Sequence, residues 1–149
     1  MSKNDTTIAV VTGASRGAGR GIAIALGAAG ATVYVTGRTV TEGEASLPGT
    51  VGSTADAVTA AGGRGVAVYC DHADDTQVQA LFEQVASEQG HLDILVNNAT
   101  HLPDSLTDKG PFWEKPLAVT QMWDVGMRSH YAASWYGAPL LLKSRRGLV

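Results

Sequence analysis

TGASRGAG, residues 12–19, is the stretch that decides the fold of this chain. An apolar, β-branched run at residues 7–11 precedes it, and a helix-like run at residues 20–26 follows it. A strand, a glycine turn and a helix start in this order present backbone N–H groups and the positive end of a helix to a phosphate. The stretch predicts a dinucleotide-binding turn if the rest of the chain supplies the strands and helices of a cofactor fold.

The bulk composition is that of one ordinary globular domain spanning residues 1–149. The chain is 44% hydrophobic and 17% charged, which allows one buried core. Its net charge of -3 and isoelectric point near 5.7 provide no broad basic surface. Nucleic acid and anionic membrane are therefore not expected as main partners.

Three further features bear on the compartment and on metal sites. Residues 1–5 carry no apolar signal region, and no run approaches the roughly 18 apolar residues of a membrane span, so a cytoplasmic protein is expected. Cys70 is the only cysteine, which excludes an internal disulfide and favours a packing role at a strand end. His101 and His130 form no metal-binding pattern, and no metal site is expected.

Strands and helices are expected to alternate along the chain. Apolar runs predict strands at 7–11, 32–36, 65–70 and 92–96, and residues 147–149 look like the start of a fifth. Helices are expected over about 17–29, 53–61, 75–89 and 117–142, the last weakened by Gly126, Gly137 and Pro139. This alternation predicts an α/β fold of the Rossmann type, a doubly wound parallel sheet of strand order 3-2-1-4.

Polar and glycine-rich groups follow the strands directly. They are residues 13–19, Arg38, Asp71 and residues 97–100. Ligands of such sheets lie at the carboxyl ends of the strands, where the strand order reverses. These four groups are therefore expected to converge on one crevice. The polar, proline-containing segment 101–116 is expected to be a long loop beside it.

Taken together, these features resemble the short-chain dehydrogenase/reductase family. The resemblance rests on the glycine pattern from Thr12, the polar end of the second strand, Asp71, and the run LVNNA at residues 95–99. FWE at residues 112–114 and MRSHY at 127–131 resemble the subgroup known as dehydrogenase/reductase member 1. The resemblance implies an oxidoreductase that transfers a hydride between a nicotinamide cofactor and a carbonyl or alcohol substrate, and it covers only the cofactor-binding portion of that fold.

The second strand ends in a residue that bears on cofactor choice. Arg38 stands where an acidic residue would accept the ribose hydroxyls of NAD, and with Arg16 it can clamp a 2′-phosphate. NADP is therefore favoured over NAD, and an exposed Arg38 without ligand contact is the alternative. The expected cofactor-binding residues are Gly13, Ser15, Arg16, Gly17, Ala18, Gly19, Arg38, Asp71, His72, Asn98 and Ala99.

Within that set, the resemblance implies specific contacts for the later residues. Asp71 with the His72 backbone is expected to contact the adenine, and the alternative for Asp71 is a turn cap at the strand end. Asn98 is expected to meet a cofactor ribose, whereas Asn97 is expected to tie adjacent strands together through its amide.

The chain also departs from the family pattern. Thr100 replaces the last glycine of Asn-Asn-Ala-Gly, and Gly126 aligns with the catalytic asparagine. The catalytic serine after strand five and the Tyr-x-x-x-Lys pair do not occur in these 149 residues, so no catalytic residue is assigned. The chain alone is expected to be inactive. A non-catalytic NADP(H)-binding or regulatory module and a non-functional truncated product are the alternatives.

A sheet that stops after four strands leaves apolar surface and a strand edge uncovered. Such surfaces promote pairing between chains. The chain is therefore expected to form a homo-oligomer or to self-associate.

Overall fold

A four-stranded parallel sheet is the centre of the fold. The computed structural model describes residues 6–149, and the expectation about a signal region in residues 1–5 lies outside that range. The strands are β1 (Ile8–Val11), β2 (Thr32–Gly37), β3 (Arg64–Tyr69) and β4 (Ile94–Val96). Their order is β3-β2-β1-β4, and every pair is parallel. The strand order expected from the sequence is confirmed.

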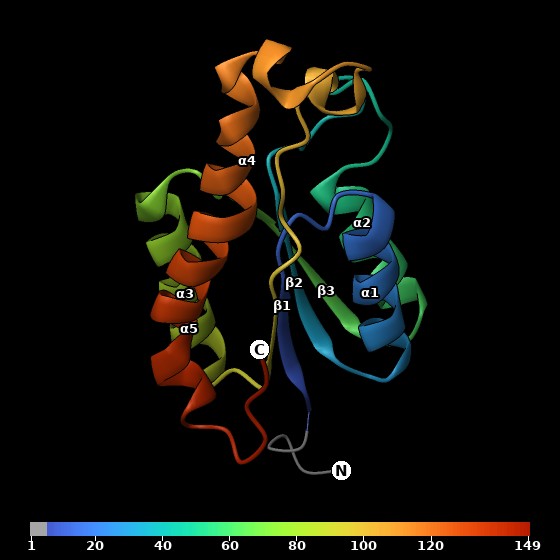
Figure 1. Cartoon of the computed structure of the whole chain (residues 1–149). Coiled ribbons are helices and arrows are strands. Elements are labelled where there is room, and N and C mark those ends of the chain that lie inside the picture. The colour runs from blue at the N-terminus through green and yellow to red at the C-terminus, as the bar shows by residue number, and fades with distance from the viewer. Residues whose placement is uncertain (1–5) are drawn as a thin grey trace.

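Helices cover both faces of the sheet (Figure 1). On one face lie α1 (Gly17–Ala28) and α2 (Val51–Ala60), and on the other lie α3 (Asp75–Gln89) and α5 (Ser129–Leu141). Strand residues alternate between the two faces. Val10 and Leu95 pack with Phe82 of α3, whereas Val11 and Val33 pack with the other helix layer. The doubly wound Rossmann-type architecture is thus confirmed.

Local capping explains where two of the helices begin. Thr50 caps α2: its hydroxyl accepts a hydrogen bond from Ser53 N at 2.9 Å, and Ser53 Oγ accepts one from Thr50 N at 3.1 Å. Asp74 caps α3 by accepting from Thr76 N at 2.9 Å. Gly90 ends α3 with φ 79°, a left-handed conformation that favours glycine. The cap at Thr50 starts α2 two residues earlier than expected.

Cys70 lies directly after β3, fully buried in the core beside α3. Burial raises the pKa of its thiol to about 12. The expected packing role at a strand end is confirmed.

The helix expected over residues 117–142 is wrong in its first half. Residues 101–120 form a loop with three short 3₁₀ turns, and α4 (Gln121–Trp123) is a single turn. Val125 (φ -112°, ψ 92°) and Gly126 (φ 146°) then leave the helical conformation. Ser129 Oγ accepts from Gly126 N at 3.1 Å, and Val125 O accepts from His101 N at 2.7 Å. These two bonds fix a kink that the loop itself helps to form.

Downstream of the kink, α5 is continuous through Gly137 and Pro139. Gly137 faces Phe82, and a Cβ there would lie 2.9 Å from the Phe82 ring. The absence of a side chain at Gly137 therefore allows α5 to approach α3 closely.

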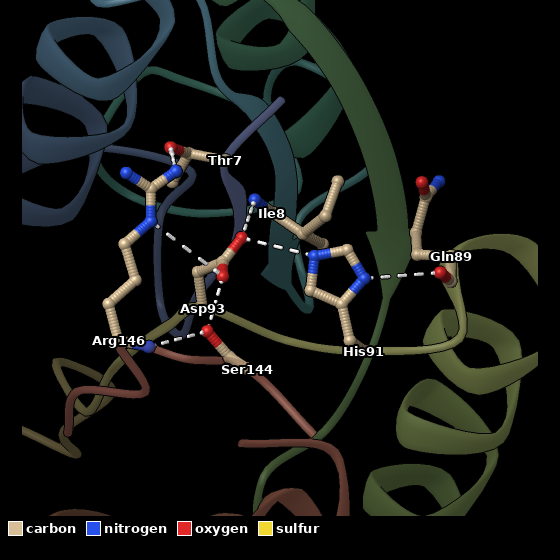
Figure 2. A network of polar contacts seen from close by, with 7 residues as sticks. All are labelled: Thr7, Ile8, Gln89, His91, Asp93, Ser144 and Arg146. Atoms are coloured by element: carbon tan, nitrogen blue, oxygen red, sulfur yellow. Dashed lines mark hydrogen bonds and ion pairs between the residues drawn. The ribbon is translucent and has the colours of Figure 1, made fainter. Parts of the chain in front are cut away.

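A buried carboxylate, that of Asp93, joins the amino-terminal ends of β1 and β4 (Figure 2). Asp93 is 5% exposed, and its oxygens accept from Ile8 N at 2.8 Å and from Ser144 Oγ at 2.6 Å. His91 Nε2 lies 3.3 Å and Arg146 Nε 4.0 Å from the same carboxylate. Burial opposes ionisation, but these donors and cations together hold the pKa of Asp93 below its usual value. Asp93 thus fixes the starts of β1 and β4 to the segment after α5.

That segment continues beside β4. Leu148 N donates to Asp93 O and Leu148 O accepts from Leu95 N, both at 2.9 Å. Leu148 is the parallel partner of Ile94. The expected start of a fifth strand at residues 147–149 is therefore present, on the free side of β4.

Candidate functional site

The glycine turn after β1 lies against the loop that follows β4. Gly13 has φ 63°, and a Cβ there would lie 2.7 Å from Ala99 Cα. A Cβ on Gly19 would lie 2.5 Å from Asn98 Nδ2. Gly17 has open space around it but requires glycine for its φ of 56°. The turn therefore uses its glycines for close packing at two positions and for backbone conformation at the third.

The N-terminus of α1 is open. The first intrahelical hydrogen bond runs from Arg20 N to Arg16 O at 3.1 Å, so the N–H groups of Gly17, Ala18 and Gly19 precede the helical ladder. No side chain among the described residues caps the helix, and its first turn carries no acidic residue. Free N–H groups and a positive helix end together form an anion-binding position.

Thr12 and Asn98 bind the glycine turn to the loop after β4. The Thr12 hydroxyl accepts from Asn98 N and from Ala99 N, both at 2.9 Å. Asn98 Nδ2 donates to Thr12 O at 2.9 Å and to Gly13 O at 3.0 Å. These four bonds hold the two loops as one unit at the carboxyl ends of adjacent strands.

Asn97 was expected to tie adjacent strands together, and this expectation is wrong, because its amide binds α5. Asn97 Nδ2 donates to Ser134 Oγ of α5 at 3.0 Å, and it is Asn98 that links the two neighbouring strand ends. Successive residues of a strand point to opposite faces, so the two asparagines face different partners. Asn97 Oδ1 is buried without a hydrogen-bond partner in residues 6–149.

Arg16 reaches across to the segment after β2. Its Nη2 donates to Thr39 Oγ1 at 2.8 Å and to Gly49 O at 3.0 Å. Arg38, adjacent to Thr39, is exposed, and no hydrogen bond or ion pair of its side chain occurs among the described residues. The structure thus brings both arginines to the same end of β2. Thr39 and Gly49 are contacts that sequence reasoning missed, since neither belongs to a recognisable spacing.

Ser15, within the glycine turn, is 8% exposed. The Ser15 backbone oxygen accepts a hydrogen bond from Thr54 Oγ1 of α2 at 3.4 Å. Ser15 therefore helps to join the turn to the neighbouring helix.

Asp71 and His72 follow β3. Asp71 Oδ1 accepts from Ala73 N at 2.9 Å, so this carboxylate caps its own turn. The His72 side chain is 4% exposed and points inward, with Nε2 2.7 Å from Thr36 Oγ1. Burial lowers the pKa of His72 to about 4. The Asp71 carboxylate thus makes the turn cap that was the alternative to an adenine contact, and the His72 ring is turned into the core.

The two departures from the family pattern lie next to each other. A Cβ on Gly126 would lie 3.1 Å from Thr100 Oγ1. The absence of a side chain at Gly126 therefore leaves room for the Thr100 side chain. His130, in the first turn of α5, donates from Nε2 to Ala99 O at 2.8 Å. This bond couples α5 to the loop after β4.

In residues 6–149 no three His, Cys, Asp or Glu side chains gather in a way that can hold a metal ion. No helix in this range has both the length and the apolar character needed to cross a membrane.

Comparisons with known proteins agree with this geometry. The family model for short chain dehydrogenase matches residues 7–149. Mouse dehydrogenase/reductase SDR family member 1 is 46% identical over 95% of this chain and 44% of its own length. The chain thus spans less than half of that curated relative.

Solved structures match over the same range. The structure of a candidate dehydrogenase from Xanthomonas campestris superposes with a TM-score of 0.85 at 32% identity, covering 95% of this chain and 50% of the other. A metagenomic short-chain oxidoreductase in complex with NADP has a TM-score of 0.78 at 31% identity, covering 95% and 59%. Sequence, fold and glycine-turn geometry together place this chain in the short-chain dehydrogenase family.

Proposed function

We propose that this chain binds NADP(H) and forms the cofactor-binding part of an oxidoreductase that transfers a hydride between NADP(H) and a carbonyl or alcohol substrate. The observation that carries the proposal is the open N-terminus of α1, with Arg16 extending from it to the end of β2. The metagenomic family member solved with NADP supports the same assignment.

The residues present fit a dinucleotide. The N–H groups of Gly17, Ala18 and Gly19 suit a pyrophosphate, because they are free of the helical ladder. The absence of side chains at Gly13 and Gly19 keeps the turn close to the β4 loop. The proposed cofactor-binding residues are Gly13, Ser15, Arg16, Gly17, Ala18, Gly19, Arg38, Asp71, His72, Asn98 and Ala99.

Charge at the end of β2 favours the phosphorylated cofactor. A carboxylate there would accept the ribose hydroxyls of NAD and repel a 2′-phosphate, whereas Arg38 attracts the phosphate. Arg16 adds a second guanidinium held at the adjacent Thr39. Guanidinium groups bind phosphate through charge-assisted hydrogen bonds, which are about twice as strong as neutral ones. NAD is therefore the weaker ligand in this proposal.

The chain's own residues bind and orient, and do not complete a reaction. When bound, a nicotinamide cofactor supplies the hydride for carbonyl reduction. The Thr12 and Asn98 bonds fix the loop beside the cofactor turn, and the His130 bond to Ala99 O fixes its far end. None of the four tyrosines in the sequence is followed by lysine at the fourth position. We therefore propose that the 149-residue chain alone lacks the proton donor, whose positioning contributes about 10² to 10⁴-fold.

One observation favours a second candidate, a non-catalytic NADP(H)-binding or regulatory module. By its resemblance to the family, the chain has Gly126 in place of the catalytic asparagine, and Thr100 Oγ1 lies 3.1 Å from where a Cβ on Gly126 would be. Sustained NADPH oxidation by the purified chain with any member of a carbonyl panel would exclude both this candidate and the proposed inactivity.

Self-association is a further part of the proposal. Tyr131, Trp135 and Leu142 lie on or just beyond α5 and are 74%, 63% and 85% exposed. Exposed aromatic and aliphatic surface of this kind favours contact with another chain.

Titration of the purified chain with NADPH, followed by nicotinamide fluorescence, tests the cofactor site. The unmodified chain is expected to bind saturably with one site per chain. Gly19→Ala is expected to lose binding, because its Cβ would meet Asn98 Nδ2 at 2.5 Å and displace the turn. Gly21→Ala is the matched control in the same helix, since a Cβ there meets nothing within 4 Å. No saturable binding by the unmodified chain would contradict the proposal.

A further inference from the structure

We propose that His130 is a positioning residue: by holding the carbonyl of Ala99, it directs the N–H of Thr100 away from α5 and toward a bound dinucleotide. The inference rests on the proposed NADP(H) function and extends it to two residues, His130 and Thr100, outside the proposed cofactor-binding set. Its basis is the hydrogen bond from His130 Nε2 to Ala99 O at 2.8 Å, part-buried between α5 and the loop after β4.

Ala99 is held by the glycine turn and by α5 together. It is 5% exposed, and its N–H donates to Thr12 Oγ1 at 2.9 Å. Its Cα lies only 2.7 Å from where a Cβ on Gly13 would be, so Ala99 packs directly on the turn. Its carbonyl oxygen can only accept, so the Nε2 atom of His130 carries the proton of their hydrogen bond. The orientation of the Ala99 carbonyl is therefore set by the His130 ring.

That carbonyl decides the direction of the next N–H group. No peptide bond in residues 6–149 is cis. In a planar trans peptide the C=O of one residue and the N–H of the next point in opposite directions. Because Ala99 O points to His130, the Thr100 N–H points away from α5. A flipped peptide would turn this N–H toward α5 and lose the bond, so His130 selects one of the two orientations.

Thr100 carries the one backbone donor of this stretch that is left open. The N–H groups of Asn98 and Ala99 both donate to Thr12 Oγ1. The N–H of His101 donates to the kink before α5 at 2.7 Å. No acceptor for Thr100 N occurs in residues 6–149, and Thr100 is exposed. Backbone donors are normally paired, and ligands of such sheets lie at the carboxyl ends of the strands, so this N–H is placed to donate to a ligand oxygen.

The position of Thr100 indicates which half of the dinucleotide it meets. In the proposed site the pyrophosphate lies at the start of α1, and Arg16 and Arg38 draw the phosphorylated adenosine half to the end of β2. A dinucleotide spans the crevice, and β4 lies on the other side of β1 from β2. The nicotinamide half therefore extends toward β4. The Thr100 N–H, just after β4, is assigned to an acceptor oxygen of that half.

Amide NMR spectra of the ¹⁵N-labelled chain test this donor without any substitution. NADPH is expected to move the Thr100 amide proton downfield, as a new hydrogen bond does. 2′,5′-ADP carries the adenosine half alone and should leave this proton in place. A Thr100 amide that responds equally to both nucleotides, or to neither while both bind, would overturn the assignment.

Variants at residue 130 test the positioning role. His130→Leu removes the donor to Ala99 O and is expected to bind NADPH about tenfold more weakly, equivalent to about 1.4 kcal/mol, with an unchanged affinity for 2′,5′-ADP in calorimetric titrations. His130→Gln keeps an N–H donor at similar reach and is expected to restore the affinity for NADPH. His101→Gln is the matched control, because His101 contacts the kink through its backbone N–H, and it should behave as wild type.

The possible failures are distinguishable. Equal affinity of the wild type and His130→Leu for NADPH would overturn the role of His130 while leaving the proposed cofactor site intact. A parallel loss of 2′,5′-ADP affinity would also overturn it, because the effect would then be on the whole turn. If the leucine variant does not fold, His130→Phe takes its place, and the amide response of the unmodified chain decides independently. A wild-type chain that binds neither nucleotide would overturn the proposed function and this inference with it.

Discussion

His72 makes the stability of this fold depend on pH in a defined window. Its ring is 4% exposed, with Nε2 2.7 Å from Thr36 Oγ1 and Nδ1 4.0 Å from Cys70 Sγ. The Thr36 hydroxyl already donates to Val11 O, so it can only accept from His72 Nε2. A second ring proton would therefore face a buried sulfur, which is a weak acceptor. Burial accordingly lowers the pKa of His72 from 6.5 to about 4.

The sign and size of the effect follow from linkage. Between pH 6.5 and about 4 the unfolded chain binds a proton at this histidine and the folded chain does not, so stability falls as pH falls. Each pKa unit corresponds to about 1.36 kcal/mol, which gives a loss of about 2 kcal/mol at pH 5 and about 3 kcal/mol at pH 4. Asp93, whose pKa is lowered from 3.8, loses its contribution only at still lower pH.

Urea unfolding at pH 7 and pH 5 measures this loss. His72→Gln removes the titrating group and keeps an amide of similar reach toward Thr36. The difference in unfolding free energy between the two pH values should be smaller in the variant by about 2 kcal/mol. His130→Gln is the control, because it removes a histidine that is only partly buried. An identical pH dependence in wild type and His72→Gln would refute the reasoning.

Two further predictions concern the buried Asp93 carboxylate and the exposed aromatic surface of α5. Asp93→Asn should lower the unfolding free energy by about 2 to 4 kcal/mol in urea, because Ile8 N, Ser144 Oγ and Arg146 lose a buried carboxylate, and a change below 1 kcal/mol would contradict this role. Light scattering of the purified chain should show a dimer or larger species that shifts toward monomer in Trp135→Ser, whose side chain is 63% exposed. A monodisperse wild-type monomer would contradict the proposed self-association.

The alternation of apolar runs with helical periodicity was enough to predict the sheet and its strand order. Each strand carries its own turn signal, and right-handed crossovers leave few topologies for a parallel sheet. Gly13 and Gly19 could be identified because their role depends on the local glycine spacing. Their partners on the β4 loop follow from the topology, since the ends of β1 and β4 are adjacent.

Other features depend on contacts that spacing does not encode. The kink at Gly126 is fixed by a bond from His101, a residue on a loop without periodicity. The Asp93 cluster joins residues more than fifty positions apart, and nothing in the local pattern distinguishes this aspartate from a solvent-exposed one. The Arg16 contact to Thr39 likewise crosses from one loop to another. Tertiary packing decides each of these, so they become visible only in the folded chain.

The ratio of the dissociation constants for NADPH and NADH tests the central claim most directly. Arg16 contacts Thr39, the neighbour of the exposed Arg38, at the end of β2, so the unmodified chain should bind NADPH at least tenfold more tightly than NADH, a difference of about 1.4 kcal/mol. Arg38→Ala should reduce this ratio mainly by weakening NADPH. Equal affinity of the unmodified chain for the two cofactors would contradict the account.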